Sequence, residues 1–553
     1  MKKLEKIRIN WGTAFFVILL AVQCLYMIYW GTQKGGYYVD EFFTYDNAHY
    51  ISASTPSRVK LYDADYMEYN KWFPVSELKS TLTVQQEEAL FHDSFSYNLN
   101  RLVQGNGNSY SSILHYVEAI FFEGELNWWS AISLNILFYI GTQILLYALV
   151  LRISSRQSSA LLSMAMYGFC GMAVSMMVYV RFYMYAIMLL TLFTYLHVRM
   201  WESCDHKKNI LWEVLSLPVL YLAFDVSPLC AGYGGAMIIC FTIGLIISRR
   251  WLQAAYYAIP ILGGGGIYAF FMTDYIDIFL NPQSSLDSGK LSAAASSLTQ
   301  NLATLNLQSL GGRIVDFSHI VCRYLFGHAV IVAAYLVIFV TAVLLYIRER
   351  HQSIRNSSRV VSEDAGHHGM EAMTYILTGT VLIYAMLSVA LALTSIRYNS
   401  FIFPELAACS VLLITMWGKE RQSRWIITGI LSVAIVGEVF FTCSIPRIQN
   451  LYREDKQGVQ AIREHSGIDS VVVDYKWDDK VMYECLAYTD ENTQVMFVTD
   501  QDADYKGLKR DTILLWQTVN RGFDVMDDLL EAGYTGIEEI GRTHESVVYL
   551  VWR

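Results

Sequence analysis

Adjacent carboxylates and two isolated arginines are the residues of this sequence whose positions indicate chemistry. Asp40 and Glu41 follow the first apolar run by about ten residues, and Arg181 and Arg397 lie in short polar breaks between later apolar runs. Ionisable side chains beside membrane-spanning segments are costly, so they are functional hypotheses by default. A carboxylate can act as a general base, and the planar fork of an arginine can bind two phosphate oxygens. The simpler alternatives are a solvated loop for the acidic pair and lipid headgroups or loop carboxylates as partners for each arginine.

The composition places these residues in an integral membrane protein. Of 553 residues, 54% are hydrophobic and only 16% are charged, and apolar runs of about twenty residues recur along the chain. The nine cysteines are scattered without the spacing of a disulfide framework or a metal site. No basic cluster with interleaved aromatic residues indicates a nucleic-acid partner.

The apolar runs predict about eleven membrane spans. The first run, after a short basic N-terminus, has no small-residue cleavage site behind it and is interpreted as an uncleaved span. The fifth run is short and contains Pro218. The predicted spans cover residues 12–30, 131–151, 159–178, 182–200, 211–225, 229–248, 252–272, 323–347, 373–393, 399–417 and 425–443.

Charge bias orients these spans. Lys and Arg gather in alternate loops, as the positive-inside rule requires when the N-terminus is cytoplasmic. The rule then places Asp40, Arg181 and Arg397 together on the outer face of the plasma membrane. Residues 31–130 and 273–322 become large outer loops, and Ser109–Phe122 is predicted to be an interfacial or re-entrant helix.

The chain is predicted to end in a small extracytoplasmic α/β domain. Its boundary divides the chain into a transmembrane domain, 1–443, and a soluble domain, 444–553. Short β-branched runs begin at Val471, Val495 and Ile513, and Val547–Val551 is a candidate last strand. Helical spacing over 478–488 and 523–532 predicts helices that cover a sheet.

An acidic pair, two arginines and many aromatic side chains on one face fit sugar transfer from a lipid-phosphate carrier.

Short motifs in the same order resemble the GT-C class of membrane glycosyltransferases. The resemblance is to the bacterial relatives of protein O-mannosyltransferases and lipid A aminoarabinose transferases. It rests on Val39-Asp40-Glu41-Phe42, on Val180-Arg181-Phe182-Tyr183, and on Arg397-Tyr398 followed by Pro404. Two departures are evident: the segment around His115 lacks the prolines common in the class, and Tyr179 stands where an acidic residue often precedes the arginine motif. His115 and Tyr179 therefore receive no role from the resemblance.

The resemblance implies inverting transfer of a sugar from a polyprenyl-phosphate carrier to an acceptor hydroxyl. Asp40 would be the general base. Glu41, on a segment taken to be extended, would point the opposite way and support Asp40. Asp46 is a further carboxylate that could substitute for Asp40.

The leaving phosphate would be bound by Arg181 and Arg397, because cations aimed at developing negative charge stabilise the transition state most. The motifs add Tyr183 and Tyr398 as substrate-binding residues. Asp225, at the outer end of the fifth span, is a possible substrate contact.

The predicted partners are a polyprenyl-phosphate sugar, a glycan, lipid or protein acceptor, and membrane lipids. No metal is expected, although Asp40, Glu41 and Asp274 are oxygen ligands that a divalent cation could use. The alternative function is a lipid-linked sugar flippase or another secondary transporter. That class typically has inverted repeats and charges near the membrane centre, and neither is apparent here.

Overall fold

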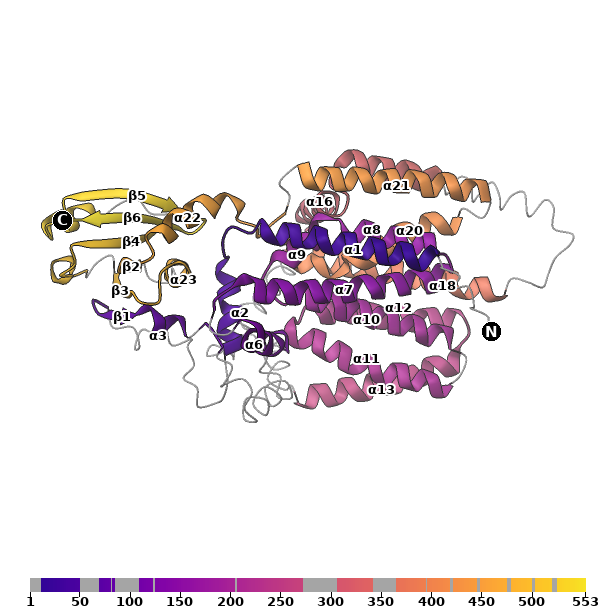
Figure 1. Ribbon diagram of the computed structural model, residues 1–553. Coiled ribbons are helices and arrows are strands. Elements are labelled where there is room, and N and C mark those ends of the chain that lie inside the picture. The colour runs from indigo at the N-terminus through magenta and orange to yellow at the C-terminus, as the bar shows by residue number, and fades with distance from the viewer. Residues whose placement is uncertain are drawn as a thin grey trace, which may run out of the picture. The chain divides into compact units, whose positions relative to one another are not determined.

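We analysed a computed structural model of the chain (Figure 1). It describes residues 11–49, 69–80, 82–84, 109–122, 125–203, 206–271, 306–341, 365–393, 395–417, 421–444, 448–474, 479–499, 503–519 and 525–553. The predicted outer loop 273–322 is described only from residue 306 onward, and Asp274 lies outside the described residues.

The chain divides into two compact units. The helical unit consists of residues 1–28, 136–177 and 182–448. The sheet unit consists of residues 29–135, 178–181 and 449–553. The four residues 178–181, which include Arg181, thus belong with the first loop region and the C-terminal segment.

Long apolar helices build the helical unit. Their bounds are α1 Trp11–Thr32, α7 Trp128–Ser154, α8 Gln157–Gly168, α9 Gly171–Val178, α10 Tyr183–Glu202, α11 His206–Val226, α12 Cys230–Ile247, α13 Trp251–Phe271, α16 Leu307–Tyr324, Ala329–Thr341, α18 Ala365–Ala390, α19 Ile396–Asn399, the 3-10 turn η2 Ser400–Ile402, α20 Phe403–Trp417 and α21 Arg421–Ser444. α1 and α7 contribute residues to both units.

These helices make the chain a multi-pass membrane protein. Six are long and apolar enough to cross a bilayer, and the number rises to eight if each of two bent helix pairs is one span. Phe15, Ile18 and Leu25 of α1 are more than half exposed, as lipid-facing side chains are. Helices also occupy the predicted spans 211–225, 252–272 and 425–443, outside that count of six to eight. The total of about eleven stays a prediction.

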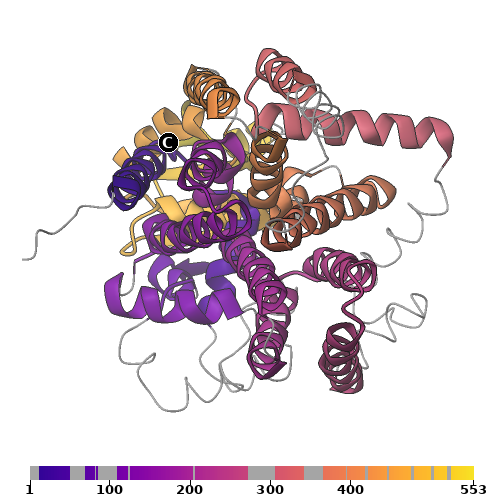
Figure 2. The same ribbon diagram turned by 90° about the vertical axis from the view of Figure 1, so that its right-hand side faces the viewer.

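One predicted span is bent, and the predicted span 323–347 follows a helix, α16, that lies almost wholly in the predicted outer loop 273–322. The span expected at 159–178 bends by 55° between α8 and α9, and α16 meets the helix Ala329–Thr341 at 95° (Figure 2). A side-chain hydrogen bond satisfies the backbone at the first bend. The hydroxyl of Tyr139 donates to the carbonyl oxygen of Gly168 at 2.9 Å, which satisfies a backbone group at the end of α8. A buried amide nearby is also paired, since Nε2 of Gln23 donates to the carbonyl oxygen of Met164 at 2.8 Å.

A six-stranded mixed sheet forms the core of the sheet unit. Its strand order is β1-β3-β2-β4-β6-β5. The central strands β3, β2 and β4 are parallel, and the pairs β1–β3, β4–β6 and β6–β5 are antiparallel. The strands are β1 Trp72–Pro74, β2 Ser470–Asp474, β3 Gln494–Thr499, β4 Thr512–Thr518, β5 Gly536–Arg542 and β6 Ser546–Trp552.

The sheet unit also contains short helices. They are α2 Val39–His49, α3 Val75–Lys79, α6 Ser109–Phe121, η3 Arg453–Asp455, α22 Lys456–Glu464, α23 Asp479–Tyr488, η4 Tyr505–Gly507 and α24 Met526–Glu531. The strands β2, β3, β4 and β6 lie at the four runs named from the sequence, and α23 and α24 lie within the two helical patterns.

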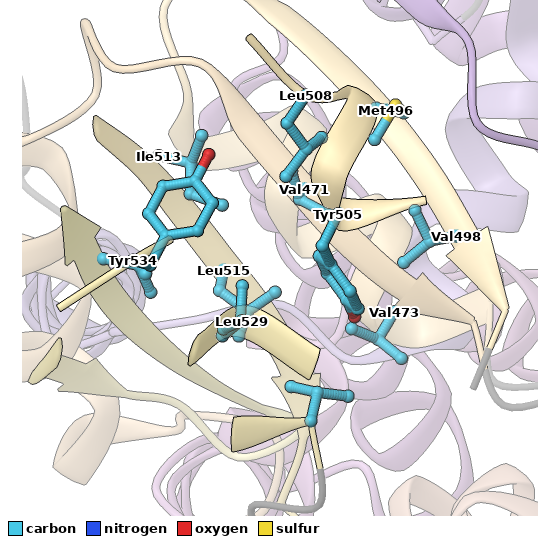
Figure 3. Close-up of a cluster of buried hydrophobic side chains, with 12 residues drawn as sticks. Val471, Val473, Met496, Val498, Tyr505, Leu508, Ile513, Leu515, Leu529 and Tyr534 are labelled. Carbon is cyan, nitrogen blue, oxygen red and sulfur yellow. The ribbon is translucent and has the colours of Figure 1, made fainter. Parts of the chain in front are cut away.

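Apolar side chains from the central strands form a buried core (Figure 3). Val471, Val498 and Leu515 project from three neighbouring strands and are fully buried. Leu508, after η4, and Leu529 of α24 pack against them. Strands buried in this way are expected to be continuously apolar, which explains why they were recognisable in the sequence.

The edge strand β1 comes from the first loop region, far from the other strands in sequence. Trp72 pairs with Met496 and Phe73 with Val495. A strand of three residues has too few positions for an alternating pattern. Its place in the sheet was therefore not predictable from the sequence, and it ties the 31–130 region to the C-terminal segment.

Candidate active site

Asp40 and Glu41 lie in the first turn of a helix, not on an extended segment. α2 begins at Val39, so both carboxylates are near a helix N-terminus, where negative charge is favourable. The expectation that the two residues face opposite ways on an extended chain is therefore wrong. Glu41 is fully buried, whereas Asp40 is partly exposed.

Glu41 is the centre of a buried ion pair. Its Oε1 accepts a hydrogen bond from Nζ of Lys34 at 2.9 Å, and both side chains are inaccessible to solvent. Burial raises the pKa of Glu41 above the ordinary glutamate value and lowers the pKa of Lys34, while their contact acts in the opposite direction for both. Removal of one partner from such a pair leaves a buried charge without compensation.

The same carboxylate holds the arginine motif in place. The backbone N–H of Val180 donates to Oε1 of Glu41 at 2.8 Å, and that of Tyr38 donates to Oε2 at 2.9 Å. Glu41 therefore links the start of α2 to the segment 178–181, although almost 140 residues separate them. Glu41 is thus bonded to two backbone N–H groups and to Lys34, and Asp40 is the partly exposed carboxylate of the pair.

Tyr179 and Arg181 contact the candidate base from this segment. The hydroxyl of Tyr179 donates to Oδ2 of Asp40 at 3.1 Å. Nη1 of Arg181 donates to the backbone carbonyl of Asp40 at 2.6 Å and to Oγ1 of Thr44 at 3.3 Å. Nδ2 of Asn135 donates to the carbonyl oxygen of Tyr179 at 2.8 Å. A carboxylate and a guanidinium are thus held side by side on the first turn of α2.

The C-terminal segment accepts hydrogen bonds from the residues just before α2. Nζ of Lys34 donates to the carbonyl oxygen of Asn450 at 2.9 Å. The backbone N–H of Gly35 donates to the carbonyl oxygen of Leu451 at 2.8 Å. A Cβ atom at Gly35 would collide with the carbonyl oxygen of Tyr452, so glycine permits this close approach. Tyr452 itself has a φ of 47°, an uncommon conformation for a bulky residue.

Two further polar residues of the first loop region are buried. Asp46 of α2 is only 5% exposed, so it is an interior residue of the sheet unit. His115 of α6, which the motifs leave without a role, has Nδ1 at 2.6 Å from the carbonyl oxygen of Ala48. Its observed contact is therefore to the backbone of α2.

Burial raises the pKa of a glutamate in α6. The hydroxyl of Ser130 donates to Oε1 of Glu118 at 2.9 Å. Burial raises the pKa of Glu118 to about 8. Glu118 is therefore protonated at neutral pH, which removes the cost of burying a charge.

The other four predicted site residues belong to the helical unit. The ring of Tyr183, at the start of α10, is buried and stacks against Phe182 with centroids 4.6 Å apart. In α19 the guanidinium of Arg397 lies 5.1 Å from the ring centroid of Tyr398. Asp225 lies near the end of α11 and is partly buried.

The sequence did not reveal three residues that shape the site. Lys34, Tyr179 and Asn135 make hydrogen bonds that hold Glu41, Asp40 and the 178–181 segment. The position of Lys34 at the end of the first apolar run was an available signal. Tyr179 was noted for its place beside Arg181, where an acidic residue is common in the class, but that place gave it no role. Asn135 carried no signal, because its partner is distant in sequence.

His, Cys, Asp and Glu side chains do not gather into a metal site in the part of the chain that the structure describes. No group of three or more His, Cys, Asp or Glu side chains in that part of the chain could hold a metal ion.

Comparison with known proteins identifies the fold. No family model and no curated protein matches the sequence. Among solved structures, ArnT from Cupriavidus metallidurans bound to undecaprenyl phosphate has a TM-score of 0.51 at 9% identity, over 97% of this chain and 98% of ArnT. The oligosaccharyltransferase of Archaeoglobus fulgidus, in complex with Zn and sulfate, has a TM-score of 0.41 at 10% identity, over 95% of this chain and 72% of that one.

ArnT is a lipid A aminoarabinose transferase, and both proteins are GT-C glycosyltransferases. The likeness to ArnT extends over almost the whole of both chains. This chain therefore has the GT-C fold, and the resemblance read from the short motifs is confirmed at the level of the fold.

Proposed function

We propose that this chain is an inverting glycosyltransferase. It moves a sugar from a polyprenyl-phosphate carrier to an acceptor hydroxyl at the outer face of the membrane. The observation that carries the proposal is the pairing of Asp40 with Arg181, whose Nη1 lies 2.6 Å from the Asp40 carbonyl oxygen. The GT-C fold supports it, and so does the undecaprenyl phosphate bound to ArnT.

Asp40 acts as the general base. Its carboxylate takes the proton of the acceptor hydroxyl while the acceptor oxygen forms a bond to the anomeric carbon from the face opposite the phosphate. The bond between that carbon and the carrier phosphate breaks, and its electron pair leaves with the phosphate. The hydrogen bond from Tyr179 holds one carboxylate oxygen, so the carboxylate is oriented before the acceptor arrives.

Arg181 stabilises the leaving phosphate. Negative charge grows on the phosphate as the sugar departs, and a guanidinium already anchored on α2 needs little reorganisation to meet it. Arg397, with its guanidinium against Tyr398, is proposed as a second phosphate-binding cation. Tyr183 and Asp225 are proposed as substrate contacts, and Asp46 keeps only a supporting position within α2.

The decisive experiment measures transfer by the purified full-length protein in lipid nanodiscs. It is given a panel of polyprenyl-phosphate sugars, and the loss of sugar from each carrier is followed by mass spectrometry. We expect one carrier to be consumed by the wild type, with activity reduced by about 10²–10⁴-fold in Asp40→Asn. The matched control is Asp528→Asn, which alters an exposed carboxylate of α24.

Two results would contradict the proposal. Full activity in Asp40→Asn would remove the base. Carrier translocation by the wild type without any loss of sugar would instead identify a flippase.

A further inference from the structure

The sheet unit contains an open cleft that the proposed catalytic residues do not occupy. Its volume is about 540 Å³, within the range of small-molecule binding sites. Three parts of the unit supply most of its walls: the segment 125–129 before and at the start of α7, the end of α22 with Arg463 and Ser466, and residues 487–491 at the end of α23. Tyr37 and Lys79 complete the lining.

Aromatic rings form a rigid wall of this cleft. The ring centroids of Tyr37 and Trp128 are 5.2 Å apart, and those of Tyr37 and Tyr488 are 6.5 Å apart. Trp129 is the fourth aromatic residue of the lining. It packs so closely against Gly31 that a Cβ atom there would lie 2.9 Å from its ring. Tyr37 and Tyr488 are buried, whereas Trp128 and Trp129 are partly exposed. The two tryptophan rings therefore present the apolar surface of the cleft, and packing holds them there without further loss of side-chain freedom.

Charged side chains of both signs stand at the same cleft. Arg463 and Glu125 are exposed, and the guanidinium of Arg463 lies 5.6 Å from the ring centroid of Tyr488. Lys79 is paired with Glu491 at 3.5 Å. Among the described lining residues the charges of both signs are close to balance, so the cleft does not favour a polyanion such as nucleic acid or a lipid phosphate.

Aromatic faces combined with a few polar groups of both signs suit an uncharged saccharide. A sugar ring has an apolar face of C–H groups that packs on an aromatic ring, and hydroxyl groups at its rim that bond to carboxylate, amide and guanidinium groups. We propose that this cleft binds an uncharged oligosaccharide segment of the acceptor. This proposal rests on the glycosyltransferase function proposed above.

Tyr37 connects the cleft to the candidate base. It lines the cleft, and its ring centroid lies 4.8 Å from that of Phe42 in α2. Asp40 follows Tyr37 by three residues in the same chain segment. A saccharide held against this wall would be bound by the same unit that carries Asp40.

The test measures oligosaccharide binding without transfer. Full-length protein carrying Asp40→Asn is used in detergent, so that binding does not depend on catalysis. The probes are maltotetraose and tetra-N-acetylchitotetraose, titrated by isothermal calorimetry. The cleft variants are Trp129→Ala and Arg463→Gln, and the matched control is Lys456→Gln, which removes a positive charge from the same helix away from the cleft.

We expect at least one probe to bind and its affinity to fall by about tenfold in each cleft variant, with no change in Lys456→Gln. Arg463 is exposed, so its variant reports on binding even where Trp129→Ala impairs folding. Absence of binding by both probes, or equal affinity in all variants, would overturn the cleft proposal. None of these results bears on sugar release from the carrier, which tests the proposed function separately.

Discussion

The hydroxyl of Tyr179 donates a hydrogen bond to Oδ2 of Asp40 at 3.1 Å. This bond joins the 178–181 segment to the first turn of α2, and it involves a tyrosine that the family motifs leave without a role. Tyr179 thus holds the carboxylate, and Arg181 donates to the backbone carbonyl of the same residue. Asp40 thus contacts residues that lie 139 and 141 positions later in the chain.

Tyr179→Phe should lower the turnover number of sugar transfer by about 10–100-fold and leave the KM of the carrier nearly unchanged. The variant keeps the buried ring and loses only the hydrogen bond to a carboxylate, which contributes about 1.5–3 kcal/mol. Steady-state kinetics with the wild-type donor checks the split between kcat and KM. Tyr233→Phe is the control, because it removes a buried hydroxyl bonded to Thr194 in the helical unit. An unchanged kcat in Tyr179→Phe would show that the bond has no catalytic role.

Glu41→Leu should destabilise the protein by about 3–5 kcal/mol, because Lys34 would then be a buried charge without a partner. Glu41→Gln should cost less, since its amide oxygen still accepts a backbone N–H. The double variant Lys34→Met with Glu41→Leu should be more stable than the sum of the single losses predicts. Thermal unfolding in detergent, followed by intrinsic fluorescence, measures each variant. Strict additivity of the two losses would mean that the ion pair is not coupled.

Arg181→Ala should weaken binding of undecaprenyl phosphate by about 10–100-fold, while Arg181→Lys should recover part of the affinity. Lysine restores the charge but lacks the planar fork that binds two oxygens. Native mass spectrometry of the lipid-bound protein measures the affinity. Arg542→Ala is the control, since Arg542 is an exposed arginine paired with Glu539. Equal lipid affinity in Arg181→Ala and the wild type would remove this residue from the phosphate site.

The stability of the sheet unit should fall as the pH rises from about 5 to 8. Burial raises the pKa of Glu484 to about 8, against an ordinary value of 4.5. Burial also raises the pKa of Asp455 to about 6. Between pH 4.5 and about 8 the folded chain keeps a proton on Glu484 that the unfolded chain releases. The unfolded state then binds fewer protons, so the free energy of unfolding falls as the pH rises.

Each such fully shifted carboxyl contributes about 1.4 kcal/mol per pH unit to this slope. Glu484→Gln should flatten the slope, because the amide does not titrate and still accepts the hydrogen bond from Oγ1 of Thr543. Unfolding midpoints at several pH values test this. A slope equal to that of the wild type would show that Glu484 ionises normally in the folded protein.

Apolar pattern and charge bias predicted much of the architecture. The long runs predicted membrane helices, and short β-branched runs predicted β2, β3, β4 and β6, because buried segments need uniformly apolar side chains. Charge placement also indicated Asp40 and Arg181, which the structure brings together on α2. The bend between α8 and α9 was not predicted, and at this bend the carbonyl oxygen of Gly168 accepts a hydrogen bond from Tyr139 of another helix.

The sequence by itself determined that this is a membrane protein with a C-terminal α/β region and that its acidic pair and arginine motif deserve a chemical role. Only the tertiary structure decided which carboxylate of the acidic pair is buried and which is partly exposed. It buries Glu41 against Lys34 and leaves Asp40 at the surface, beside Tyr179 and Arg181. The physical reason is that burial and hydrogen bonding depend on partners far away in the chain, and no local pattern of residue types encodes those distances.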